Sequence, residues 1–200
     1  LADFKIKCIV LKYPEAICKS IKGLSYQEEM DFIVSHEGRN NFIRDLAINL
    51  KGNSLILFTY VEKHGKILFD LINEKVDNRK VFFIHGGTEA EDREAVRHIT
   101  EKETDAIIVA SYGTFSTGVN IRNLHNIIFS SPTKSKIRSL QSIGRGLRLG
   151  DNKDKAMLYD IADDLRYGPY VNFTLKHYEE RVKIYSEEKF EISTTSVRIS

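Results

Sequence analysis

Two arginines and a glutamine have residue types and a spacing that suit phosphate binding. In the run Gln141-Ser-Ile-Gly-Arg-Gly-Leu-Arg148, the amide and the two guanidinium groups stand at i, i+4 and i+7, which places them on one face of a helix. Gly144 and Gly146 each cost about 1 kcal/mol relative to alanine in a helix, but they let a ligand or another domain approach the backbone. Forked, permanently charged donors on such a face suit a phosphate that arrives from outside. A solvated basic helix end before Gly150 is the alternative.

The elements that must position these residues alternate between strands and helices. Short apolar runs predict buried parallel strands, and the stretches between them have helical periodicity. Strands are expected at 54–59, 80–84, 106–110, 126–129 and 156–161, and helices at 62–75, 89–102 and 135–147. Thr88 is the expected cap of the helix at 89–102. This alternation predicts an α/β fold with a parallel sheet and helices on both faces.

The flanking segments add further elements. Residues 4–11 alternate and are β-branched, which predicts a strand at the edge of the sheet. Residues 25–50 are rich in helix formers, and Ser25 with Glu28 predicts a capping box at their start. A charged helix is expected at 172–189 and a last strand at 190–199. The aromatic residues of this extension are expected to pack in a core; base stacking is the alternative for Tyr167, Tyr170, Phe173 and Tyr178.

Polar loops that contain glycine follow three of the expected strands. Thr59-Tyr60 follows the first sheet strand, His85-Gly86-Gly87 the second, and the run 111–120 the third. Ligands of parallel sheets bind at the carboxyl ends of the strands, so these loops predict a binding surface. His85 itself is expected to pack at its strand end.

Composition narrows the class of protein. The net charge is +2, so nucleic acid needs a local patch if it binds, for which Lys134, Lys136 and Arg138 are candidates. No apolar run approaches the ~20 residues of a membrane span and no signal peptide is visible, so a cytoplasmic chain is expected. Cys8 and Cys18 are expected to be reduced core thiols. The start at Leu1 suggests a fragment or a processed product.

Four segments in order resemble motifs of the second, C-terminal RecA-like domain of superfamily 2 helicases. LILFTYVEKHG (55–65) resembles motif IV, IHGGT (84–88) the short motif that follows it, IIVASYGTFSTGVNI (107–121) motif V, and QSIGRGLR (141–148) motif VI. Asn120 stands where motif V often has Asp, and Gln141 where motif VI often has His. Segment 116–121 and the divergent flanks are most similar to the phage branch of the family, which acts on branched DNA.

The resemblance implies a role for each matched residue. Arg145 and Arg148 would act as arginine fingers on the γ-phosphate of ATP, and Gln141 would orient the attacking water or the arginines. Gly118 would let the loop approach the nucleotide, and Asn120 would bind the ribose. A simple turn at a helix start is the alternative for Gly118. The candidates for nucleic-acid contact are Thr59, Gly86, Ser111 and Thr114, for which ordinary loop capping is the alternative.

The family's phosphate loop and magnesium carboxylates are absent from the sequence. No G-x-x-x-x-G-K-[ST] occurs, and Gly65-Lys66 is followed by Ile67. The family places both features on the N-terminal RecA-like domain, so ATP and Mg²⁺ are expected there, and this chain is expected to hold no metal and to be inactive alone. The segments are predicted as a linker with an edge strand and helices (1–50), the RecA-like domain (51–165) and a helical extension (166–200).

The predicted function is the C-terminal motor domain of a monomeric, ATP-dependent DNA helicase. Its expected partners are branched or single-stranded DNA and the N-terminal RecA-like domain of the same protein, with no membrane. The resemblance implies a role in recombination, replication and repair. A duplex translocase that does not unwind is one alternative, and a non-catalytic docking module for nucleic acid or protein is another. The choice between DNA and RNA stays open.

Overall fold

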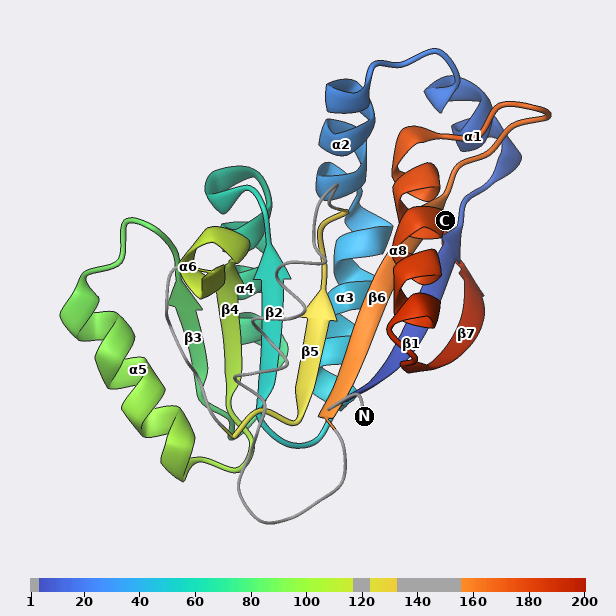
Figure 1. Cartoon of the computed structure of the whole chain (residues 1–200). Coiled ribbons are helices and arrows are strands. Elements are labelled where there is room, and N and C mark those ends of the chain that lie inside the picture. Colours follow the sequence, from blue (N-terminus) through green and yellow to red (C-terminus); the bar gives the residue numbers. More distant parts are fainter. Residues whose placement is uncertain (1–3, 117–122, 133–155) are drawn as a thin grey trace.

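A parallel sheet forms the frame of the domain. The structure is a computed structural model that describes residues 4–116, 123–132 and 156–200. Within these residues seven strands pair in the order β3-β4-β2-β5-β6-β1-β7, and every neighbouring pair is parallel (Figure 1). The strands are β1 (Phe4–Lys12), β2 (Ser54–Phe58), β3 (Val81–Ile84), β4 (Ile107–Ser111), β5 (Asn126–Phe129), β6 (Ala156–Asp164) and β7 (Glu191–Arg198).

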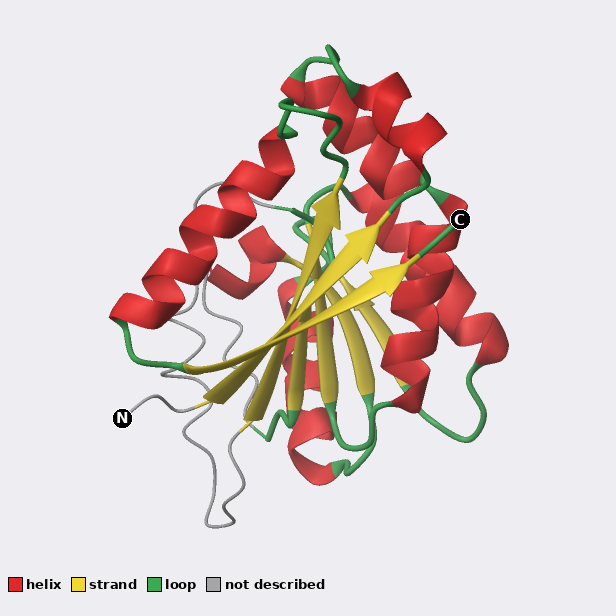
Figure 2. Ribbon diagram, turned by 90° about the vertical axis from the view of Figure 1, so that its right-hand side faces the viewer, coloured by secondary structure: helices red, strands yellow, loops and turns green. Residues whose placement is uncertain are grey.

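Helices cover both faces of this twisted sheet (Figure 2). The described helices are α1 (Glu15–Ile21), α2 (Tyr26–Ser35), α3 (Glu37–Asn49), α4 (Lys66–Lys75), α5 (Ala90–Lys102), α6 (Tyr112–Ser116) and α8 (Phe173–Glu187), with a π-helical turn at Val61–Gly65 before α4. The predicted three-layer α/β architecture is therefore confirmed. The predicted helix at 135–147 lies outside the described residues.

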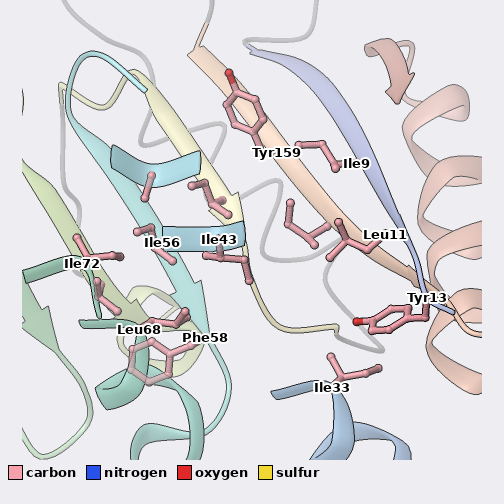
Figure 3. Close-up of a cluster of buried hydrophobic side chains, with 14 of the residues drawn as sticks. Ile9, Leu11, Tyr13, Ile33, Ile43, Ile56, Phe58, Leu68, Ile72 and Tyr159 are labelled. Carbon is pink, nitrogen blue, oxygen red and sulfur yellow. The ribbon is translucent and has the colours of Figure 1, made fainter. Parts of the chain in front are cut away.

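Strict alternation along the strands sends side chains into two cores. In β4, Ile108 and Ala110 join a core with side chains of α8. Ile107 and Val109 join the opposite core, which α1, α2, α3 and α4 cover. Figure 3 shows part of this second core, where side chains of the helices pack on those of the sheet: Ile43, Ile56, Phe58, Leu68 and Ile72.

The prediction that the strand at 4–11 forms an edge is wrong. β1 pairs with β6 on one side and with β7 on the other. Ile6 and Cys8 are buried in the core that α8 covers, whereas β7 is the exposed edge. The sheet thus contains strands from all three predicted segments, and the division at residues 50 and 165 stays a prediction.

Of the two predicted helix N-caps, one is confirmed and one is wrong. The capping box of α2 is confirmed, because Ser25 Oγ accepts from the Glu28 N–H and the Ser25 N–H donates to the Glu28 carboxylate at 3.0 Å. The prediction that Thr88 caps the next helix is wrong, because Glu89 is the N-cap residue of α5. Thr88 Oγ1 instead accepts from the His85 N–H at 3.0 Å, which makes it part of the turn after β3.

The two cysteines are buried free thiols, as predicted. In the part of the chain that the structure describes, no helix combines the length and the apolar character needed to cross a bilayer.

Candidate functional site

The carboxyl ends of β3, β4, β2 and β5 lie side by side at one edge of the sheet, the upper edge in Figure 1. The register pairs Phe58 at the end of β2 with Ser111 at the end of β4. On the other side of β4, Ile84 at the end of β3 pairs with Ala110. The loops that carry Thr59, Gly86 and Ser111 therefore leave neighbouring strands, as the sequence predicts for a shared surface.

Thr59 and Gly86 are the exposed members of the predicted nucleic-acid set. The Thr59 N–H is held from inside, because it donates to Ser131 Oγ at 3.1 Å. A Cβ added to Gly86 would meet no atom within 4 Å, so this loop presents bare backbone to the surface. His85 packs on Phe83 with ring centroids 5.2 Å apart and accepts from the Gly87 N–H through Nδ1. The prediction that His85 packs at its strand end is confirmed.

Ser111 and Thr114 bind each other. Both side chains are buried, at 8% and 3% exposure. Their hydroxyl oxygens lie 2.6 Å apart, and the Thr114 N–H also donates to Ser111 Oγ at 3.3 Å. This geometry closes the turn from β4 into α6, so the two residues shape the loop from within. Their contact with nucleic acid stays a prediction.

The predicted nucleotide-facing residues lie outside the described residues: Gln141, Arg145, Arg148, Gly118 and Asn120, together with the basic cluster Lys134, Lys136 and Arg138. Described residues do flank them in sequence. α6 ends at Ser116, and the loop Ser130–Pro132 after β5 leads directly into residue 133. That loop is accordingly the described segment that precedes the predicted arginines in sequence, and β6 is the described segment that follows them.

An ion pair that the sequence did not predict lies buried under this edge. Arg39 of α3 and Asp163 of β6 are both fully buried. The guanidinium donates to both carboxylate oxygens, at 2.8 and 3.1 Å, and to the Ser130 carbonyl at 2.6 Å. Burial alone would lower the pKa of Arg39, but the facing Asp163 carboxylate raises it, so the guanidinium stays charged. Tyr13 OH donates to Asp163 Oδ1 at 2.6 Å; burial, then Asp163, raise the pKa of that phenol well above its ordinary value.

A second unpredicted group centres on His64, which is fully buried. Its Nδ1 lies 2.9 Å from Ser131 Oγ, and its Nε2 lies 3.1 Å from Asn40 Oδ1. Burial, and then the charge of Arg39, lower the pKa of His64 to about 3. The ring is therefore neutral at physiological pH. Nothing in the helical pattern of 62–75 signals this role, because the partners come from α3 and from the loop after β5.

The flanking helices are tied together by polar contacts. The buried Glu29 carboxylate of α2 accepts from the Phe173 and Thr174 N–H groups at the start of α8, at 3.0 and 2.7 Å, where a carboxylate also suits the helix dipole. Tyr178 is buried in the core beside the sheet, as expected for the extension. Phe173 is 37% exposed and meets Tyr26 edge to face, so the expectation that this ring packs in the core is wrong.

Comparison with known proteins gives a consistent result. The family described as helicase conserved C-terminal domain matches residues 38–150. The chain is 36% identical over 212 residues to the ATP-dependent DNA helicase uvsW of Enterobacteria phage T4, an alignment that covers 100% of this chain and 42% of that protein. It is 29% identical over 109 residues to the putative ATP-dependent helicase IRC3 of Saccharomyces cerevisiae, which covers 54% of this chain and 15% of that relative.

Solved structures agree with the sequence relatives. The crystal structure of T4 UvsW matches with a TM-score of 0.86, covering 98% of this chain and 42% of that one. The E. coli DEAD-box protein SrmB, at 14% identity, matches with a TM-score of 0.60 over 96% of this chain and 92% of that one, which shows the fold alone. These results confirm the predicted RecA-like fold and the narrower resemblance to the phage protein. This chain spans less than half the length of that protein.

Proposed function

The chain belongs to the helicase conserved C-terminal domain family, and from that premise we propose that it is the C-terminal motor domain of an ATP-dependent helicase that acts on branched DNA. The 36% identity to the phage T4 DNA helicase across the whole chain is the observation that carries this proposal. Forks, Holliday junctions and R-loops are the substrates that the phage resemblance implies, in recombination, replication and repair. The cytoplasm of a phage-infected bacterium is the corresponding location.

ATP and Mg²⁺ belong, in this proposal, mainly to an N-terminal RecA-like domain that faces this one. No phosphate loop occurs in the sequence, and among the described residues no group of three His, Cys, Asp or Glu side chains is placed to hold a metal ion. ATP supplies the free energy of its hydrolysis, and closing and opening of the two domains turn that free energy into steps along the strand. The enzyme acts as a monomer, and the isolated 200-residue chain does not hydrolyse ATP.

Arg145 and Arg148 are the proposed arginine fingers. Charge supplied by such a residue to the γ-phosphate in the transition state accelerates nucleotide hydrolysis about 10³–10⁵-fold. Gln141, on the same predicted helix face, orients the attacking water or the arginines. Gly118 allows the backbone to approach the nucleotide closely, and Asn120 binds the ribose. All five residues lie within residues 38–150, the segment that the family model matches.

Nucleic acid crosses the carboxyl edge of the sheet in this proposal. Exposed Thr59 and the bare backbone of Gly86 suit contacts with phosphates, which position a strand without reading its sequence. Ser111 and Thr114 contribute through the turn that their mutual hydrogen bond closes. Because the net charge is only +2, binding by this domain alone is weak and sensitive to salt.

DNA-stimulated ATPase activity of the full-length enzyme tests the proposal. Arg145→Ala and Arg148→Ala are expected to lower kcat about 100-fold, because they remove charge needed mainly in the transition state, while ATP affinity holds. Lysine at either position rescues poorly, since it lacks the planar fork. Arg97→Ala is the matched control, because Arg97 pairs with Glu94 and Glu101 on the surface of α5. Normal turnover in both finger variants would contradict the proposal and favour a docking module.

A further inference from the structure

A chain of hydrogen bonds runs inward from Thr59, and its direction follows from the groups at its far end. Asn40 Nδ2 donates to the Val34 carbonyl at 3.0 Å, so Asn40 Oδ1 is the atom that faces His64. An amide oxygen can only accept, so His64 Nε2 carries the hydrogen and donates to it. His64 Nδ1 is therefore the acceptor for the Ser131 hydroxyl.

Ser131 completes the chain at the surface. Its hydroxyl hydrogen is committed to His64, which leaves an oxygen lone pair for the Thr59 N–H at 3.1 Å. Its carbonyl accepts from Tyr112 OH at 3.2 Å. Ser131 is 2% exposed, whereas Thr59 is exposed. One buried residue thus links the surface residue after β2 to a fixed imidazole.

The backbone around His64 is built to place it there. The turn Val61–Gly65 is π-helical, a form that recurs at functional sites, and the Gly65 N–H closes it on the Tyr60 carbonyl at 2.8 Å. A Cβ on Gly65 would lie 2.4 Å from the Phe58 ring, so only glycine lets the turn sit this close to β2. The buried ring stays neutral, because burial lowers its pKa to about 3, and its two hydrogen-bond partners then select one of the two neutral tautomers.

We propose that His64 and Ser131 are positioning residues for the nucleic-acid contact at Thr59. The inference rests on the proposed function. The Ser131 hydroxyl holds the Thr59 N–H on the buried side of the peptide. The exposed side of Thr59 therefore meets a phosphate in one orientation. His64 fixes the Ser131 hydroxyl, which could otherwise turn its hydrogen toward Thr59 and break the contact.

The roles of the two imidazole nitrogens can be distinguished by substitution. His64→Asn keeps an acceptor near the position of Nδ1, whereas His64→Gln keeps a donor near Nε2 and loses the acceptor for Ser131. In the full-length enzyme, His64→Gln and Ser131→Ala are expected to raise the DNA concentration for half-maximal ATPase stimulation about fivefold, the effect of one hydrogen bond. His64→Asn stays within about twofold of the parent. In all three variants kcat at saturating DNA and KM for ATP hold.

Ser35→Ala is the control variant. It removes a hydroxyl that hydrogen-bonds to the backbone within α2, and it is expected to leave the DNA concentration for half-maximal ATPase stimulation unchanged. If His64→Gln and Ser131→Ala lower thermal stability but leave the DNA concentration for half-maximal ATPase stimulation unchanged, the residues are merely structural and the inference is overturned. A parent ATPase with no response to any nucleic acid overturns the proposed function and the role at Thr59 together, a result distinct from unshifted variants of a responsive parent.

Imidazole ¹⁵N chemical shifts of the 200-residue chain test the geometry without activity. The expected spectrum at neutral pH shows His64 with Nε2 protonated and Nδ1 free of hydrogen, and Ser131→Ala shifts the Nδ1 signal because that nitrogen loses its donor. An Nδ1-protonated ring, or an imidazolium, is incompatible with the inferred direction of the hydrogen bonds and overturns the inference whatever the kinetics show.

Discussion

Arg39→Ala should be among the most destabilising single substitutions in this domain. Arg39 is fully buried and gives two hydrogen bonds to Asp163 and one to the Ser130 carbonyl. Among the described residues, alanine would leave the buried Asp163 carboxylate with only the hydroxyl of Tyr13 as a side-chain donor. Breaking a buried ion pair from one side costs about 3–5 kcal/mol, and the carbonyl left without its donor adds to that cost. We expect a loss in the upper part of this range.

Urea unfolding of the 200-residue chain, followed by circular dichroism, measures the effect. With a slope of about 2 kcal/mol per molar urea, the midpoint is expected to fall by about 2 M. Arg44→Ala is the matched control on the same helix, because Arg44 pairs with the half-exposed Asp45. Such surface pairs contribute about 0–1 kcal/mol.

The comparison between the two arginine variants decides the matter. A midpoint for Arg39→Ala that lies within about 0.3 M of Arg44→Ala, or about 0.6 kcal/mol, would refute the assignment of a stabilising buried pair. The joint replacement Arg39→Met with Asp163→Leu is expected to recover part of the loss, since it removes both charges at once. No recovery would mean that the hydrogen bond to Ser130, rather than the ion pair, carries the cost.

Three further expectations concern buried groups. Because the pKa of His64 falls from 6.5 to about 3 on folding, the unfolded state binds more protons between these values; stability is present above about pH 6.5 and lost toward pH 3. His64→Asn should remove up to about 1.4 kcal/mol per pH unit of that slope near pH 5, measured by urea unfolding. Gly65→Ala should cost about 1–3 kcal/mol through its clash with Phe58, whereas Gly86→Ala, open to solvent, should leave the melting temperature unchanged. Burial raises the pKa of Cys8 to about 12, so its alkylation near pH 8, followed by mass spectrometry, should require unfolding; rapid modification of the folded chain would contradict this.

Elements whose signal is local were predictable from the sequence. The apolar runs at 54–59, 106–110 and 126–129 became the central strands because a strand buried on both faces leaves a continuous apolar signature. The capping box at Ser25 was predictable for the same reason, since its two hydrogen bonds join residues three apart. Parallel strands end at one edge, which is why Thr59, Gly86 and Ser111 could be brought together from their positions alone.

Features that depend on distant partners could not be predicted. The alternating pattern of residues 4–11 made β1 look like an edge strand, because β7, which pairs with it, follows about 180 residues later. Arg39 and Asp163 are 124 residues apart, and neither position carries a periodic signal for the other. The mutual hydrogen bond of Ser111 and Thr114 is a local i to i+3 pattern. This spacing in the sequence favours a role for the two hydroxyls in closing a turn.

The loop Ser130–Pro132 shows why the first fifty residues are more than a connection to another domain. Arg39 of α3 binds the Ser130 carbonyl, while the Ser130 hydroxyl donates to the Leu57 carbonyl of β2. Ser131 is held by His64, and through that ring by Asn40 of α3. The chain continues from this loop into the residues that include Arg145 and Arg148. The contacts from α3 therefore fix this loop against the sheet, so residues 36–49 form part of the frame of the domain rather than a separate connection.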